Sequence, residues 1–203
     1  MIRRTWCVAL GIGVLVFAAA PASAQVSFGA KAGMNVATAD VEPPLNLEYD
    51  SRFDWLAGVL VVAAPDSPIG GQVELLFSRR GTGVKVGSSG VLDAEYKFTF
   101  IDIPVLLRAR AIRLESSGLF ILAGPTIGIS MEAEGEQSGV ADDVSDRFES
   151  YDLGLTIGAA FEASGFIADA RYTHGLSNYA NGSHPALQEF KSRTLSLSMG
   201  LRF

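Results

Sequence analysis

Cysteine is almost absent from this sequence of 203 residues, in which Cys7 is the only one. It lies in an N-terminal segment where Arg3 and Arg4 precede an apolar stretch and Ala22-Ser23-Ala24 forms an A-x-A cleavage site. We therefore expect residues 1–24 to be a cleaved signal peptide and residues 25–203 to form one domain without disulfide bonds or thiol chemistry. A retained N-terminal helix is the weaker alternative, because the apolar stretch is shorter than the roughly 20 residues of a membrane-spanning helix.

Long apolar runs are missing from residues 25–203 as well. The longest, from Trp55 to Ala64, has about half of the roughly 20 residues that a transmembrane helix needs. Basic charge is also scarce, since the net charge of −6 becomes −8 once the two positive charges of Arg3 and Arg4 are removed. This balance argues against nucleic acid as a partner. Because 48% of the residues are nevertheless hydrophobic, the apolar side chains must follow another pattern.

Motifs for catalysis and cofactor binding are absent too. The sequence has two histidines, His174 and His184, and no phosphate-binding loop, metal-ligand cluster or dinucleotide fingerprint. We therefore expect no catalytic residue, no cofactor and no metal site.

The pattern that the sequence does show is alternation of apolar with small or polar residues. Because successive side chains of a strand point to opposite faces, such a segment has one apolar face and one polar face. The last segment is the most regular, with Leu195, Leu197, Met199, Leu201 and Phe203 on the apolar phase. The four clearest segments are residues 26–36, 72–80, 151–163 and 194–203.

Four less regular segments complete the set, at residues 52–63, 94–111, 118–131 and 166–176. In the second, alternation around Asp102 and Arg108 leaves Tyr96, Phe98 and Phe100 on the same inward phase. This conflict predicts a bulge, or a strand that continues beyond the membrane. Pro104 and Pro125 weaken the strand assignment locally, since each removes one ladder hydrogen bond.

Eight strands of about ten residues or more are enough to span a bilayer and close on themselves. The expected connections alternate between short, at residues 64–70, 112–117 and 164–165, and long, at residues 38–51, 81–93, 132–150 and 177–192. We therefore predict an all-β fold, an eight-stranded antiparallel up-and-down transmembrane β-barrel.

The polar phase indicates which face is the interior. It contains eight glycines, which suit the narrow interior of an eight-stranded barrel; they are Gly29, Gly33, Gly58, Gly124, Gly128, Gly154, Gly158 and Gly200. A soluble lipocalin-like barrel is the alternative, but it would place the apolar face inside and expose the charges of the polar phase.

Several motifs in this order resemble the outer-membrane protein β-barrel domain family, which includes PorT-like proteins and small barrels labelled "porin family". The motifs are FGAKAGMN at residues 28–35, QVELLFSRRG at 72–81, FIDIPVLLR at 100–108, LAGPTIG at 122–128, YDLGLTIGAAFE at 151–162, DARYTHGLSN at 169–178 and the closing LSLSMGLRF. The resemblance implies a location in the outer membrane of a Gram-negative bacterium, in contact with its lipids and lipopolysaccharide. It implies no defined reaction, and we expect a monomer.

The terminal aromatic Phe203 closes the last alternating strand. It resembles the signal by which the barrel-insertion machinery of the outer membrane recognises its clients. A plain interfacial aromatic is the compatible alternative.

Charged residues on the inward phase predict a salt-bridge network that plugs the lumen, because buried charges must be paired or hydrated. Its members are Lys31, Glu74, Arg80, Asp102, Arg108, Glu162, Asp169, Arg171 and Arg202. The alternative is a proton or ion path, that is, a narrow porin-like transporter. Free diffusion of solutes is not expected, because side chains nearly fill an eight-stranded barrel.

An enzyme that modifies lipid A is a second alternative, because small deacylases of the outer membrane use a histidine and a serine on one strand. His174 and Ser177 differ by three positions, however, and an odd offset puts their side chains on opposite faces. The long connections at residues 38–51 and 132–150 are acidic. Their carboxylates suit weak binding of divalent cations, without the spacing of a tight site.

Overall fold

The computed structural model describes residues 25–42, 47–86, 92–137, 140–143, 151–176 and 189–203. Side chains are described over residues 25–36, 53–80, 99–131, 151–176 and 193–203. The predicted signal peptide, residues 1–24, lies outside the described residues. No helix in the described part of the chain is long and apolar enough to cross a membrane.

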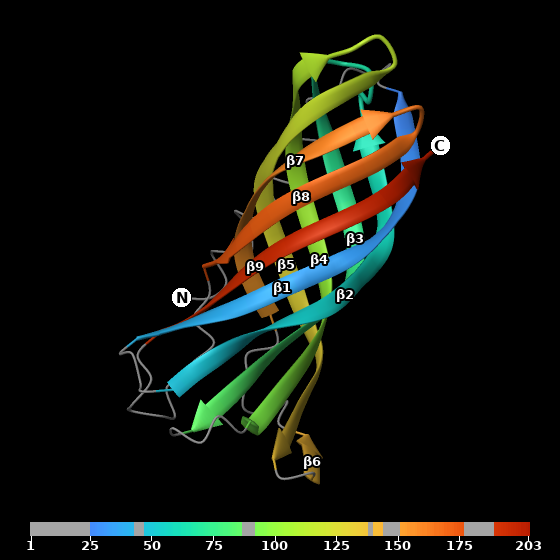
Figure 1. The fold of residues 1–203 in the computed structure, drawn as a ribbon. Coiled ribbons are helices and arrows are strands. Elements are labelled where there is room, and N and C mark those ends of the chain that lie inside the picture. The colour runs from blue at the N-terminus through green and yellow to red at the C-terminus, as the bar shows by residue number, and fades with distance from the viewer. Residues whose placement is uncertain (1–24, 43–46, 87–91, 138–139, 144–150, 177–188) are drawn as a thin grey trace, which may run out of the picture.

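Nine strands make up the described fold (Figure 1). They are β1 (Val26–Glu42), β2 (Leu47–Ala63), β3 (Ile69–Val86), β4 (Leu92–Arg113), β5 (Ser117–Gln137), β6 (Val140–Asp143), β7 (Tyr151–Ala163), β8 (Phe166–Gly175) and β9 (Glu189–Arg202). Eight of them pair antiparallel in the order β4-β3-β2-β1-β9-β8-β7-β5, and pairing of β4 with β5 closes the ring. The short strand β6 pairs with β5. The predicted eight-stranded up-and-down barrel is confirmed.

The ring closes between the first and the last strand of the chain. The register of β1 against β9 runs from the pair Gly29 and Arg202 to the pair Glu42 and Glu189. At the start of this seam, Phe28 and Phe203 exchange two backbone hydrogen bonds of 3.0 and 2.8 Å. Closure gives every barrel strand a paired neighbour on both sides, as a membrane-spanning sheet requires.

One end of the barrel, the short-turn end, holds the three tight connections and lies at the top of Figure 1. The connection between β7 and β8 has two residues, Ser164 and Gly165, with φ of 48° and 84°. Two successive positive φ angles are those of a type I′ turn, whose twist matches that of the flanking strands. Ala64, after β2, also has a positive φ of 54°. The short connections therefore lie where the sequence predicts them.

The opposite end, the long-strand end, differs from the prediction. Residues 38–42, 47–51, 81–86, 132–137 and 140–143 lie in expected loops but belong to strands. The physical reason is that backbone pairing does not depend on the polarity of the side chains, so two strands can stay paired beyond the membrane. Alternation of apolar and polar side chains is needed only where one face of the strand meets lipid. Hydrophobic periodicity therefore marks the apolar segment of each strand and not its full length.

The two faces of the wall have the predicted polarity. On β9, the outward residues Leu197, Met199 and Leu201 are 59%, 65% and 62% exposed, whereas the inward Thr194 and Ser198 are buried. Exposed and buried side chains alternate in the same way along β1, β3, β7 and β8. Because the exposed side is apolar and the inner side holds the charges, the lipocalin-like alternative is wrong.

The irregular positions of β4 and β5 behave as expected. The register between these strands shifts at Thr99 and Phe100, and β4 continues to Leu92. The predicted bulge and the predicted extension therefore both occur. Pro104 and Pro125 lie inside their strands. Between β3 and β4, the ladder is interrupted around Pro104, between the pair Leu76 with Asp102 and the pair Val73 with Val105.

The interior also has an apolar part that the alternation did not predict. The inward side chains of Leu60, Val62 and Ile167 form one buried cluster. A second cluster consists of Leu106, Phe120, Leu122 and Ala160. All lie in the half of their strands nearer the short-turn end. The inward phase is thus a mixed core and not a uniformly polar one.

Glycines allow the largest inward side chains to fit. Lys31 on β1 has Gly58 on β2 and Gly200 on β9 as its two cross-strand partners. A Cβ atom on Gly200 would lie 2.3 Å from the carbonyl oxygen of Ala30 and 2.6 Å from Cβ of Lys31. A residue with a side chain at Gly200 would therefore force the two strands apart.

Candidate functional site

The middle of the lumen holds four of the predicted network residues, Lys31 on β1, Glu74 on β3, and Asp169 and Arg171 on β8. We call them the central cluster. Nζ of Lys31 lies 2.9 Å from Oε2 of Glu74 and 3.1 Å from Oδ2 of Asp169. Arg171 donates to both carboxylate oxygens of Glu74 at 2.8 and 2.7 Å, and its Nε lies 3.0 Å from Oδ1 of Asp169.

The central cluster is buried and balanced. Its four side chains are at most 5% exposed, and two positive charges face two negative ones. Such a cluster persists in a barrel interior because each charge has an opposite partner within hydrogen-bonding distance. The bidentate fork of Arg171 fixes the orientation of Glu74 as well as its charge. Contacts among β1, β3 and β8 connect different sides of the wall across the lumen.

The next layer, toward the long-strand end, contains the predicted residues Asp102 and Arg80 together with Asp152. Nη2 of Arg80 donates to Oδ2 of Asp102 at 2.5 Å, and Nη1 of Arg80 lies 3.5 Å from Oδ2 of Asp152. The Arg80 guanidinium also lies 4.8 Å from the ring centroid of Phe100. Asp152 is absent from the predicted network, although it lies on the inward phase of its segment.

Hydroxyl and amide groups fill the same part of the lumen. Thr156 shares hydrogen bonds with Thr126 at 2.6 Å and with Thr173 at 2.8 Å. Asn35 donates to Ser78 at 2.8 Å and accepts from Ser196 at 2.7 Å. A cavity of about 30 Å³ among these groups has room for one or two water molecules. Sequence reasoning singled out none of these groups, and their inward phase was the only signal.

Nearer the short-turn end lies the floor cluster, made of the remaining predicted residues Arg108 on β4, Glu162 on β7 and Arg202 on β9. Nη2 of Arg108 lies 2.9 Å from Oε1 of Glu162, and Nη2 of Arg202 lies 3.5 Å from Oε2 of Glu162. The Arg108 guanidinium stacks on the ring of Phe120, 3.9 Å from its centroid. The predicted residues thus form three layers along the barrel axis.

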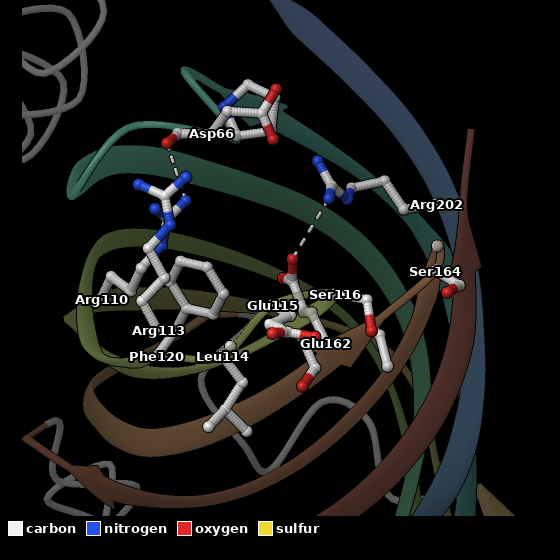
Figure 2. A pocket seen from close by; sticks show the side chains of 15 residues that line it. Asp66, Arg110, Arg113, Leu114, Glu115, Ser116, Phe120, Glu162, Ser164 and Arg202 are labelled. Atoms are coloured by element: carbon white, nitrogen blue, oxygen red, sulfur yellow. Dashed lines mark hydrogen bonds and ion pairs between the residues drawn. The ribbon is translucent and has the colours of Figure 1, made fainter.

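A pocket opens from the floor cluster at the short-turn end (Figure 2). Its volume is about 300 Å³, at the lower limit for sites of small molecules. Arg110, Arg113 and Glu115 lie around it together with Phe120, Glu162 and Arg202. Arg110 donates to the backbone carbonyl of Asp66 at 2.7 Å. We call this space the mouth pocket. No pattern in the sequence predicted it, because turns distant in sequence supply part of its wall.

The histidine of the enzyme alternative does not face the lumen. His174 lies on the outward phase of β8, where its ring stacks with that of Tyr172 at a centroid distance of 6.5 Å. Ser177 and His184 lie outside the described residues. Among the side chains that the structure describes, no group of three or more His, Cys, Asp or Glu residues is arranged to hold a metal ion.

Comparisons with known proteins agree with this architecture. The family model described as "Outer membrane protein beta-barrel domain" matches residues 18–181. Neisserial surface protein A has a similar structure, with a TM-score of 0.55 and 14% identity over 88% of this chain and 99% of that one. OprG from Pseudomonas aeruginosa gives a TM-score of 0.52 and 11% identity over 89% and 97%.

Ail from Yersinia pestis, in complex with the heparin analogue sucrose octasulfate, gives a TM-score of 0.49 and 16% identity over 88% of this chain and 99% of that one. Among curated protein sequences no match is found.

Proposed function

This chain belongs to the outer membrane protein beta-barrel domain family, and from that premise we propose that it is a small non-enzymatic barrel with a plugged lumen, which displays acidic segments for structural or surface-interaction roles. It is a protein of the bacterial outer membrane. In barrels of this membrane, short turns face the periplasm and long connections face outward. The mouth pocket therefore faces the periplasm and the long-strand end faces the exterior.

The central cluster is the observation that carries the plugged-lumen proposal. Two cations and two carboxylates lie across the middle of the lumen with contacts of 2.7 to 3.1 Å. A permeating ion would have to separate these pairs in a low-dielectric interior. Apolar side chains such as Leu60, Leu106 and Leu122 close the space between this cluster and the periplasm.

Conductance in planar bilayers tests this proposal. The folded protein, identified by its heat-modifiable mobility on gels, should give no stable single-channel current. The Glu74→Ala variant, which removes the bidentate partner of Arg171, serves as the matched control for an opened lumen. Large and stable currents from the unmodified protein would overturn the plug and favour the transporter alternative.

The long-strand end supports a role at the cell surface. The sequence from residue 132 to 150, which contains the end of β5 and all of β6, carries seven carboxylates against one arginine, Arg147. The carboxylates are those of Glu132, Glu134, Glu136, Asp142, Asp143, Asp146 and Glu149. Their side chains lie outside the described residues. One of the similar structures is named a surface protein. Carboxylates at this place suit bridging by Mg²⁺ or Ca²⁺ to the phosphates of lipopolysaccharide.

A variant with these acidic residues changed to Asn and Gln tests the surface role. In vesicles of lipopolysaccharide, the unmodified protein should gain thermal stability on addition of Mg²⁺, and the variant should gain less. An equal response of both proteins would show that these carboxylates do not mediate the contact.

Export and insertion complete the proposal. Residues 1–24 act as the signal peptide, and Phe203 acts as the insertion signal for a barrel that remains monomeric. The backbone carbonyl of Gln25 accepts a hydrogen bond from Ala64 at 2.9 Å, so β1 starts directly after the proposed cleavage site. N-terminal sequencing of outer-membrane fractions should begin at Gln25, and a start at Met1 would contradict this cleavage.

A lipid A-modifying enzyme is the main competing function. Mass spectrometry of lipid A separates the two, because cells that express the protein should show the same acylation pattern as cells that express Ser177→Ala. A difference that requires Ser177 would establish the enzyme instead.

A further inference from the structure

The floor cluster differs from the central cluster in its charge. It contains two guanidinium groups, Arg108 and Arg202, and a single carboxylate, that of Glu162. The side chains of Arg108 and Glu162 are 1% and 7% exposed, and that of Arg202 is 19% exposed. One positive charge at the base of the mouth pocket is therefore without a carboxylate, and a buried charge of this kind is costly unless it is compensated.

Hydrogen bonding shows the same deficit. Within the described residues, the buried nitrogens Nε, Nη1 and Nη2 of Arg108 and Nε of Arg202 have no hydrogen-bond acceptor in suitable geometry. In the balanced central cluster, Nε of Arg171 is the one such nitrogen among the described side chains. Each cluster also has one carboxylate oxygen without a donor in suitable geometry, Oδ1 of Asp169 and Oε2 of Glu162, so the excess of donors is larger in the floor cluster. The ring of Phe120 offsets part of the cost by a cation–π contact with Arg108. A negative charge near Arg202 would offset more of it.

An anion can reach the floor cluster through the mouth pocket and bind there. The pocket opens toward the periplasm and is directly lined by Arg202, Glu162 and Phe120 (Figure 2). At its rim, Arg110 and Arg113 lie together on one side, opposite Arg202. Asp66 and Glu115 balance the two rim arginines, so the excess positive charge is that of the floor. Nη1 of Arg202 donates to Oγ of Ser27 over a long 3.4 Å, and its Nη2 lies 3.5 Å from Oε2 of Glu162. A guanidinium held by such long contacts is a geometric match for the oxygens of an incoming carboxylate or phosphate.

We propose that the mouth pocket is a binding site for a small anion, a carboxylate or phosphate group presented from the periplasm. The anion contacts Arg202, with Arg110 and Arg113 at the rim, and Arg108 acts on it by charge from beneath Phe120. A cation is not the expected ligand, because Glu162 is already shared by two guanidinium groups. The pocket lies inside the ring of turns and not on the lipid-facing wall, which favours a solute over a lipid headgroup.

Nuclear magnetic resonance of the folded protein in phosphatidylcholine nanodiscs tests this site. Sodium phosphate and sodium acetate are titrated separately at constant ionic strength, and the arginine side-chain NH resonances are followed. Saturable shifts at Arg202 with a dissociation constant of about 1 mM or lower are expected. A third arm replaces part of the lipid with phosphatidylglycerol. A shift at Arg202 without added solute would identify the lipid phosphate as the source of the anion.

Variants with opposite expected effects make the test specific. Arg202→Gln should weaken binding roughly tenfold or more, whereas Glu162→Gln should strengthen it because it removes the only floor carboxylate. Arg113→Gln repeats the first test at the exposed rim, in case Arg202→Gln does not fold. Arg79→Gln, on the outward face of β3 and away from the pocket, should leave binding unchanged.

Two outcomes would overturn the proposal. One is the absence of a saturable shift at Arg202 with both anions and in both lipid compositions. The other is equal binding by the unmodified protein and by folded Arg202→Gln and Arg113→Gln. Neither outcome bears on the plugged lumen, which the conductance measurement tests independently.

Discussion

The outer and inner faces of the barrel wall come from the same alternating strands, yet they impose different requirements on their residues. On the outward face, positions such as Leu197 and Leu201 meet lipid, and any apolar side chain of ordinary size satisfies them. On the inward face, Lys31, Glu74 and Arg171 each depend on particular partners at 2.7 to 2.9 Å. The outer face therefore requires only apolar side chains, whereas the inner face requires particular pairs of residues. Substitutions on the two faces should differ in their effect on stability accordingly.

The largest effect is expected for Glu74→Ala on the inner face. The change leaves Lys31 and Arg171 with Asp169 as their one remaining partner in the central cluster, and breaking a buried ion pair costs about 3–5 kcal/mol. Urea titration of the protein folded in lipid vesicles gives the change in the free energy of unfolding.

Glu115→Ala is the control for this prediction, since Glu115 is an exposed residue of the short-turn end. It should change the free energy of unfolding by less than about 0.5 kcal/mol. If Glu74→Ala changed the free energy of unfolding as little as Glu115→Ala, the ion pairs of the central cluster would not contribute to the stability of the barrel.

The next effect concerns polarity on the outer face. Leu197→Arg should cost about 2–4 kcal/mol if residue 197 lies near the bilayer midplane, because an arginine there must be taken into hydrocarbon. The adjacent change Ser196→Asn should cost less, since Ser196 faces the lumen and hydrogen-bonds to Asn35. The same urea titration compares the two variants, and equal costs would remove the distinction between the faces.

A smaller effect is expected from volume alone. Gly200→Leu leaves the charge of the inner face unchanged but places a side chain against the backbone of Ala30 and Cβ of Lys31. Overpacking of this kind costs about 1–3 kcal/mol. Gly200→Ala should have the same sign with a smaller cost, and the order of the two folding free energies checks that volume is the cause. A stabilising Gly200→Ala would mean that the strands have more room than the geometry indicates.

The membrane-spanning part of the fold could be predicted from the sequence because lipid imposes alternation on it. The phase of β9 follows from Leu195 to Phe203 without further information. The bulge near Phe100 was also predictable, since three aromatics there lie out of phase with Ile101 and Ile103. Beyond the bilayer, no such constraint acts. The extension of β5 to Gln137 and the short strand β6 were therefore missed.

The candidate sites were only partly accessible to sequence reasoning. Inward phase brings Lys31, Glu74 and Asp169 to the lumen, but phase does not give height along the barrel axis. The axial position depends on the stagger between strands, which brings Arg108 of β4, Glu162 of β7 and Arg202 of β9 to one level. The mouth pocket was harder still, because Asp66, Glu115 and Ser164 come from three different turns. Only the closed ring brings those turns together.

The seam between β1 and β9 sets the order in which this protein can be made. Gly29, near the start of the domain sequence, pairs with Arg202, near its end. The ring therefore cannot close until the last strand has crossed the inner membrane. Until then both β1 and the growing end expose unpaired strand edges, which invite aggregation. Contacts so distant in sequence also form slowly. A chain cut short by one strand would keep two open edges permanently. Pairing of β9, a strand of fourteen residues, is therefore the step that commits the molecule to the membrane.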